Sequence, residues 1–148
     1  MRSHVKAIFA VLGIVLVAAC HDPIIVNGDA SGTYALTAVN GSPLPFLLAA
    51  TTTDTVVITS GSITINTDGT FSEALSADQT TGGVKTTHSD VCPGTYSQSG
   101  NSFTFTESTT TPDPNCGSQY SASWDGDKTV SLFFTGYQLD YTMNVVAL

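Results

Sequence analysis

His88 and Asp90 are the residues of this sequence whose types and spacing come nearest to those of a hydrolytic enzyme. Both lie in the polar segment VKTTHSDV, and side chains two residues apart on a β-strand point to the same face. With one of the many serines they could form a Ser-His-Asp triad. The chain has no Gly-x-Ser-x-Gly motif to expose a nucleophile, however, and a solvated polar strand explains the segment as well. We therefore expect that the protein is not an enzyme, with hydrolysis at His88 as an alternative to test.

Metal chemistry has equally little support in the sequence. His88 is the only histidine after residue 21, so a histidine-rich zinc site cannot be assembled. Asp125-Gly126-Asp127 could offer oxygen ligands to calcium. Asp-Gly is also a common tight turn, and this loop lacks the further acids that a calcium site needs. We expect no metal site and no cofactor.

The N-terminal segment has the pattern of an export signal. Arg2 and Lys6 precede an uncharged apolar run at 7–19. As a helix this run would measure about 20 Å, which is short of the roughly 30 Å hydrocarbon core of a bilayer. A positive start, a short apolar core and small residues at its end are typical of a cleaved signal peptide, here 1–19.

The end of this run, LVAAC at 16–20, resembles the lipobox of bacterial lipoproteins, in which small residues precede an invariant cysteine. The resemblance implies that Cys20 carries a diacylglyceryl group and becomes the first mature residue, with 20–30 as a tether. Two acyl chains anchor a protein stably where one does not. His21 is not the familiar inner-membrane retention signal, which favours the outer membrane, with the domain facing the periplasm or the cell surface. The alternative is an uncleaved signal anchor with Cys20 buried.

Cys92 and Cys116 remain as a pair once Cys20 is lipidated. In an oxidising compartment an even pair predicts a disulfide, which here would close a loop of about 25 residues. Two free thiols or a metal pair are the alternatives, and no Cys-x-x-Cys motif indicates redox catalysis. The segment 111–117, TPDPNCG, is then a pinned loop, which could serve as a contact surface.

The mature chain from residue 20 is strongly acidic. Lys85 and Lys128 are its only fixed cations against all 12 acidic residues, a net charge of −10. Such a chain repels phosphate backbones, so we expect no nucleic-acid partner. The 23 threonines and 16 serines of the full sequence are interleaved with apolar residues. Threonine fits the solvent-facing side of a sheet, which favours an all-β domain.

Period-2 alternation of apolar and polar residues then predicts a series of short strands in hairpin order. We expect one domain at 31–148, with strands of five to eight residues and one or two strands within 54–66. Hairpin-linked antiparallel strands build a meander β-barrel, and closure removes sheet edges, so we favour a barrel over the alternative β-sandwich. The expected strands lie at 33–39, 54–66, 70–77, 84–91, around residue 96, and at 102–106, 120–124, 130–134 and 139–145, with an apolar patch at 46–50.

Three stretches resemble bacterial lipocalin-like lipoprotein domains: GTYALTAVNGSPLP at 32–45, SITINTDGTF at 62–71 and GTYSQSGNSFTFT at 94–106. The resemblance implies a barrel that binds a small apolar ligand. Seven aromatic residues are expected to point inward, where they either form the core or line a ligand cavity. They are Tyr34, Phe71, Phe103, Phe105, Trp124, Phe134 and Tyr141.

These observations lead to one functional expectation and one alternative. We expect a membrane-anchored envelope lipoprotein whose non-catalytic barrel binds a small apolar ligand. The alternative is a structural or interaction module that contacts another envelope protein.

Overall fold

The computed structural model of the protein describes residues 29–110, 115–134 and 136–143. Every regular element within these ranges is a β-strand, as predicted. The described residues include no helix that is long and apolar enough to cross a lipid bilayer. The expected signal peptide, the lipidation site Cys20, the tether up to residue 28, part of the pinned loop (111–114) and the end of the last expected strand all lie outside the described residues.

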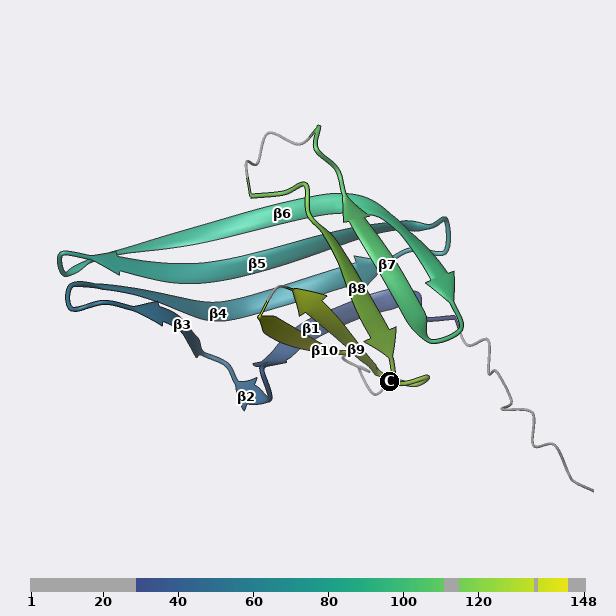
Figure 1. Ribbon diagram of the computed structural model, residues 1–148, viewed down its shortest axis with the longest axis horizontal. Coiled ribbons are helices and arrows are strands. Elements are labelled where there is room, and N and C mark those ends of the chain that lie inside the picture. Colours follow the sequence, from purple (N-terminus) through teal and green to yellow (C-terminus); the bar gives the residue numbers. More distant parts are fainter. Residues whose placement is uncertain (1–28, 111–114, 135, 144–148) are drawn as a thin grey trace, which may run out of the picture.

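Ten strands follow one another along the described chain (Figure 1). Their bounds are β1 Gly32–Val39, β2 Ser42–Pro43, β3 Phe46–Ala50, β4 Asp54–Ile65, β5 Thr70–Thr81, β6 Val84–Ser99, β7 Ser102–Glu107, β8 Gln119–Trp124, β9 Thr129–Phe134 and β10 Tyr137–Met143.

Eight of these strands form a closed antiparallel barrel. β4 to β10 pair in sequence order, and β1 pairs with β10 on one side and with β4 on the other. The predicted meander barrel is thus confirmed, and the sandwich is excluded. β2 and β3 stand outside the closed ring, because β2 pairs with the end of β1 and β3 pairs with the start of β4.

β5 and β6 are much longer than the five to eight residues expected, with 12 and 16 residues. β4 has 12 residues and is the single strand that was one of the two alternatives within 54–66. β5 and β6 pair without a register shift from Thr81 and Val84 to Thr70 and Thr95, so their hairpin runs on beyond the ring. With β3 and the start of β4 it forms a projecting four-stranded sheet, which we call the arm, residues 46–58 and 77–91 (Figure 1).

Two further differences from the sequence prediction concern local structure. The apolar patch at 46–50 is the strand β3, which forms an edge of the arm. The strands expected at 84–91 and around Tyr96 are one strand, β6. Pro93 is tolerated there because β6 pairs with β7 only from Gly94 onward, so the missing N–H of Pro93 costs no bond to β7. Of the two alternatives within 54–66, the single strand is confirmed: β4 covers 54–65 and has a bulge between Ile58 and Ser60.

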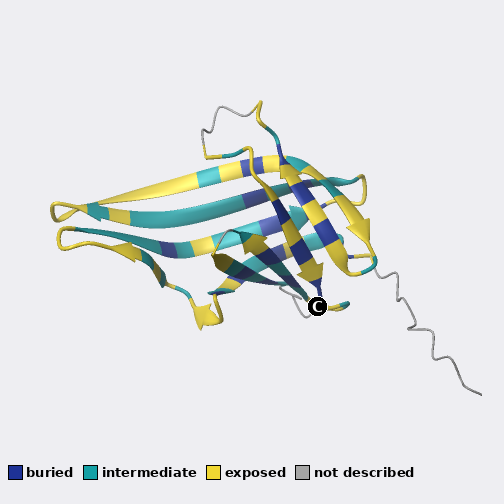
Figure 2. Ribbon diagram, viewed as in Figure 1, coloured by how far each residue is buried: buried dark blue, intermediate teal, exposed yellow. Residues whose placement is uncertain are grey.

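The inside of the barrel is filled with side chains away from the arm. Buried residues cluster where the eight strands surround one another, while the arm is largely exposed (Figure 2). Phe71 and Phe105 meet edge to face at 4.7 Å between ring centroids, and Phe103 and Phe105 stack at 5.6 Å. A side chain at Gly94 would collide with Phe71, so the glycine lets the wall approach these rings.

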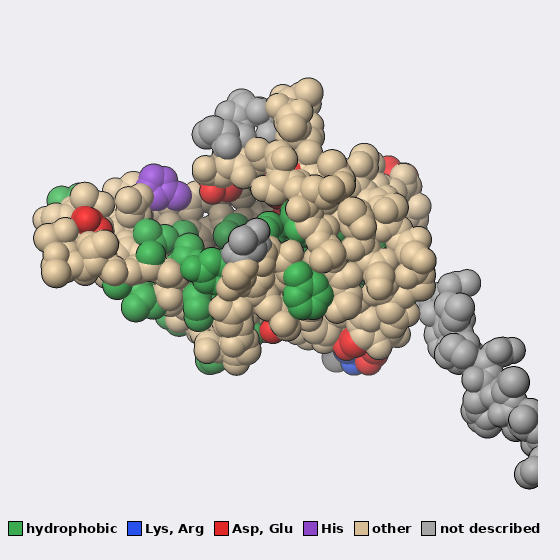
Figure 3. All heavy atoms as spheres, in the orientation of Figure 1, with side chains coloured by type: hydrophobic (Ala, Val, Ile, Leu, Met, Phe, Trp, Pro, Cys, Tyr) green, Lys and Arg blue, Asp and Glu red, His purple; other side chains and the backbone are tan. Residues whose placement is uncertain are grey.

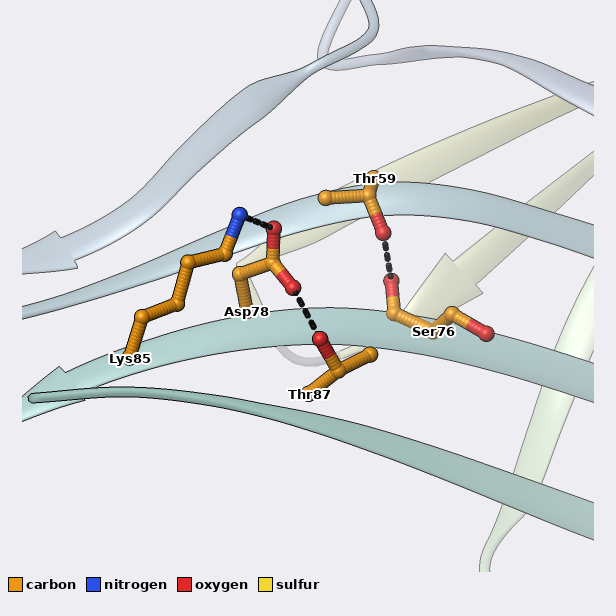
Figure 4. Close-up of polar contacts among 5 residues, drawn as sticks. All are labelled: Thr59, Ser76, Asp78, Lys85 and Thr87. Atoms are coloured by element: carbon orange, nitrogen blue, oxygen red, sulfur yellow. Dashed lines mark hydrogen bonds and ion pairs between the residues drawn. The ribbon is translucent and has the colours of Figure 1, made fainter.

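Polar contacts link neighbouring strands on the outer side of β4, β5 and β6 (Figure 4). The Lys85 ammonium lies 2.7 Å from Asp78 Oδ2, and the Thr87 hydroxyl donates to Asp78 Oδ1 at 2.7 Å. These two hydrogen bonds, with that from Lys85 the larger cause, lower the pKa of the Asp78 carboxyl. Thr59 donates to the Ser76 carbonyl at 3.2 Å on the same sheet. The long strands therefore satisfy their outer side with hydroxyl and charged groups.

Candidate functional site

The candidate site lies at the end of the barrel from which the arm projects, which we call the arm end. β5 supplies its inner wall through alternating inward residues, Phe71, Glu73, Leu75 and Ala77. Phe71 belongs to the aromatic core, and Leu75 is only partly buried. The packing therefore loosens along β5 toward the arm.

An apolar hollow of about 230 Å³ opens at the arm end. Its exposed lining is entirely apolar, and its residues come from five strands. Hydrophobic side chains gather along the arm and continue into the hollowed middle of this face (Figure 3). The residues that line it are Leu48, Ile58, Leu75, Phe134, Tyr137 and Leu139.

A second hollow, of about 160 Å³, lies beside the first; its lining mixes apolar with polar and acidic side chains, and we call it the polar hollow. Leu75 and Phe134 line both hollows, so these two side chains form their shared boundary. Either hollow alone is smaller than the roughly 300 Å³ at the lower end of small-molecule sites, and the two together offer an apolar and a polar compartment. The other residues of the polar hollow are Glu73, Asp90, Cys92, Glu107, Asn115 and Ser118.

Glu73 is the most deeply buried of the carboxyl groups in this hollow, with 6% of the residue exposed. Its Oε2 accepts a hydrogen bond of 2.8 Å from the Tyr120 hydroxyl, and its Oε1 accepts one from the Tyr141 hydroxyl. Burial raises the pKa of the Glu73 carboxyl above its ordinary value; the two tyrosine hydrogen bonds lower that pKa, and the nearby Glu107 charge raises it. Glu73 therefore retains its proton more readily than an exposed glutamate.

Glu107 is the second buried carboxylate, with 7% of the residue exposed. Its Oε2 accepts hydrogen bonds from the backbone N–H groups of Gly117 and Ser118, at 2.9 and 2.8 Å. Its Oε1 accepts no hydrogen bond from any residue that the structure describes. One oxygen is thus used to hold the segment before β8, and the other is left without a protein donor.

The predicted disulfide between Cys92 and Cys116 is confirmed, and it forms part of the site. Cys92 is an inward residue of β6 that lines the polar hollow. The bond holds the chain after residue 115 against β6, where Asn115 donates to Asp90 Oδ2 at 3.1 Å. The same segment supplies the two N–H groups that bind Glu107. The disulfide therefore fixes one wall of the polar hollow.

The seven aromatic residues considered as ligand-lining candidates fall into two groups. Among them, Phe134 alone lines either of these two hollows, and it contacts Tyr120 at 4.3 Å between ring centroids. The other six are buried in the core at 0–6% exposure: Tyr34, Phe71, Phe103, Phe105, Trp124 and Tyr141. Leu75 and Leu139, which are aliphatic, line the apolar hollow in their place.

His88 and Asp90 lie on the same face of β6, but no described hydrogen bond joins them. Asp90 accepts from Asn115 instead. Asp125 accepts backbone N–H bonds from Asp127, Lys128 and Thr129 at 2.9 Å each, so this carboxylate closes its own turn. Nowhere in the described ranges do three or more His, Cys, Asp or Glu side chains gather in a way that could hold a metal ion.

Sequence reasoning passed over Glu73 and Glu107 as members of the site. The alternation that places Phe71 and Leu75 inward also places Glu73 inward, and the pattern of Phe103 and Phe105 extends to Glu107. If the alternation of inward and outward residues had been continued past the acidic residues, it would have placed both Glu73 and Glu107 inside the barrel.

Comparison of the chain with protein-family models, with curated proteins and with solved structures finds no match.

Proposed function

We propose that this protein is an envelope lipoprotein, anchored through a diacylglyceryl group on Cys20, whose non-catalytic barrel binds a small apolar ligand at the arm end. The observation that carries the ligand site is the wholly apolar hollow beside Leu75 and Phe134 at the mouth of an otherwise packed barrel. Small-molecule sites are typically concave and mostly apolar, with a few polar groups, and they favour barrel mouths. The export pattern of the first 20 residues supports the anchor. His21, which is not the familiar inner-membrane retention signal, supports the outer-membrane location.

The ligand site is tested by filling the hollow. Leu48 lines it from β3, while its neighbour Leu47 is 55% exposed and lies outside the hollow. Leu48→Trp should occupy the hollow and raise the Kd of an apolar probe such as octanol by about tenfold or more, a loss of about 1.4 kcal/mol or more. Leu47→Trp is the matched control and should leave the Kd unchanged. Equal affinity of both variants and the wild type, measured by native mass spectrometry, would exclude this site.

The anchor is tested separately, on protein from its natural host. We expect the intact mass of a chain that starts at Cys20 and carries acyl groups, and we expect Cys20→Ser to release the protein from membranes. An unmodified chain that starts at Met1 would refute the anchor without touching the ligand site.

An interaction module is the second candidate, and one observation favours it. β6 pairs with β7 only from Gly94 onward, so its edge at 84–92 has no strand partner among the described residues. An open edge can accept an extended peptide by strand addition. A partner bound there would be retained by both tryptophan variants, which separates this candidate from the ligand site.

A further inference from the structure

The polar hollow is lined by three carboxyl groups and by no basic side chain. Glu73, Asp90 and Glu107 line it, and none of its lining residues is Lys, Arg or His. Of the two lysines in the described ranges, Lys85 is bound to Asp78 on the outer face of the arm, and Lys128 lies in the turn between β8 and β9. Buried carboxylates are normally paired with a cation or fully hydrogen-bonded, since burial of an unpaired charge is costly.

Glu107 is the buried carboxyl group of this hollow that lacks, within the part of the chain that the structure describes, a hydrogen-bond donor on one oxygen. Two backbone N–H groups satisfy its Oε2, while its Oε1 has no donor among the described residues although only 7% of Glu107 is exposed. Glu73 differs, because both of its oxygens accept tyrosine hydroxyls. A carboxylate oxygen that opens into a hollow and lacks a protein donor is a group to which a ligand can donate a hydrogen bond.

We infer that the ligand is an amphiphilic amine, whose apolar body lies in the apolar hollow and whose protonated amino group donates to Glu107 in the polar hollow. This inference rests on the proposed ligand-binding function. Leu75 and Phe134 border both hollows, so one molecule that passes between them would reach both compartments. An ammonium group also matches the negative charge of the lining, because it supplies the N–H donors and the positive charge that the lining residues lack.

A carboxylate or an alcohol on the same apolar chain would be a poorer ligand. A carboxylate would add a further negative charge beside Glu107 and Asp90, and like charges in a poorly solvated site repel strongly. An alcohol supplies one neutral donor, whose hydrogen bond is roughly half as strong as a charge-assisted one. The ranking amine, then alcohol, then carboxylate is thus specific to this lining.

The test compares octylamine, octanol and octanoate by calorimetric titration of the purified full-length protein at neutral pH. We expect octylamine to bind at least about tenfold more tightly than octanol and octanoate to bind most weakly. Glu107→Gln should remove the advantage of the amine over the alcohol, because glutamine can still accept the two backbone bonds but carries no charge. Asp127→Asn, at the exposed turn between β8 and β9, is the control that removes the same charge elsewhere and should leave the ratio unchanged.

The possible outcomes separate this inference from the proposed function. Equal binding of amine and alcohol, both blocked by Leu48→Trp, would overturn the amine and keep the ligand site. Absence of binding by all three probes would overturn both. An amine advantage that survives in Glu107→Gln would reflect general attraction to an acidic protein and would also overturn the inference.

A measurement on the wild type keeps the inference falsifiable if Glu107→Gln does not fold. In ¹³C-labelled protein, the side-chain carboxyl resonance of Glu107 should move on addition of octylamine and stay in place on addition of octanol. A Glu107 resonance that ignores octylamine at saturation would contradict the contact.

Discussion

The Tyr120 hydroxyl on β8 donates a 2.8 Å hydrogen bond to Glu73 on β5, although β6 and β7 separate these strands around the barrel wall. Tyr141 on β10 donates to the other oxygen of the same carboxyl group. One buried side chain therefore joins three strands across the interior, directly beneath the polar hollow. This arrangement makes the stability of the barrel depend on the protonation of Glu73.

Glu73→Gln should alter how stability depends on pH. Burial raises the pKa of Glu73 above the 4.5 of an ordinary glutamate, so the folded protein binds this proton more tightly than the unfolded chain. The resulting stabilisation is complete below the unfolded pKa and is lost as pH rises through the folded pKa. Glutamine mimics the protonated form at every pH, so the variant should gain stability relative to the wild type as pH rises above about 4.5.

Urea unfolding of both proteins from pH 4 to pH 8 measures this difference. The free energy of unfolding of Glu73→Gln minus that of the wild type should increase with pH and then level off. Parallel pH profiles would show that the Glu73 carboxyl has the same pKa in the folded and the unfolded protein. That result would contradict the claim that burial raises its pKa.

Tyr34 should resist ionisation until the barrel opens. Its hydroxyl donates to the Ala30 carbonyl at 2.7 Å, and burial, with smaller contributions from Asp125 and Asp29, raises its pKa to about 12. Folding thus favours the protonated phenol, and this contribution to stability is lost as pH rises from 10 toward 12. Tyr34→Phe removes the ionisable group and should weaken the alkaline loss of stability. It should also cost about 1–3 kcal/mol at neutral pH, because the buried Ala30 carbonyl loses its donor. An unchanged alkaline transition in this variant would contradict the assignment.

The alternation of apolar and polar residues was sufficient to predict the barrel, because hairpin-linked strands of this kind close on themselves. It could not predict the arm. Strand length beyond the ring depends on the register of β5 against β6, and the threonine-rich segment 84–91 carries no core residue that would mark it as part of a longer strand. The break expected near Pro93 was wrong for a related reason, since only the strand pairing reveals that the β6–β7 ladder starts at Gly94, so the N–H that Pro93 lacks is not needed there.

The site was harder to predict than the fold, because it depends on which inward residues remain uncovered. The seven inward aromatic residues were candidates for the lining of a cavity. Six of them are instead packed in the core of the barrel. The apolar hollow forms where aliphatic residues such as Leu75 and Leu139 meet the arm. Composition alone does not locate such a gap. The disulfide was predictable from the number of cysteines and the expected oxidising compartment, but its role in holding the donors of Glu107 was not.

Loss of the disulfide should cost stability and loosen the polar hollow. The bond joins residues 24 apart in sequence, and the loop-entropy relation gives about 3–4 kcal/mol for a loop of this size. The Cys92→Ser, Cys116→Ser double variant should therefore unfold at a lower urea concentration, and its octylamine affinity should fall. Asp78→Asn, on the outer face of the arm, is a control that should leave ligand affinity unchanged. Affinity unaffected by the double variant would mean that the disulfide does not form the wall of the site.

Gly94→Ala should destabilise the barrel by more than an ordinary glycine substitution. A Cβ at this position would lie 2.5 Å from Phe71 Cε1 and would also collide with the Thr106 carbonyl and the backbone of Glu107. Overpacking of this kind typically costs about 1–3 kcal/mol. Gly100→Ala is the comparison: it meets no atom within 4 Å and bears only the strain of its φ of 59°, so we expect a smaller loss of about 1 kcal/mol. Equal melting temperatures for the two variants would contradict the close approach at Gly94.

The most direct test of the ligand site is a methyl NMR titration of the full-length protein with octylamine. The methyl resonances of Leu48, Ile58, Leu75 and Leu139 should shift together and saturate, whereas those of Ile63, Ile65 and Val130 in the packed core should stay in place. Shifts confined to exposed methyl groups such as those of Leu47 and Val91, or no saturable shift at all, would show that the hollow at the arm end does not bind this ligand.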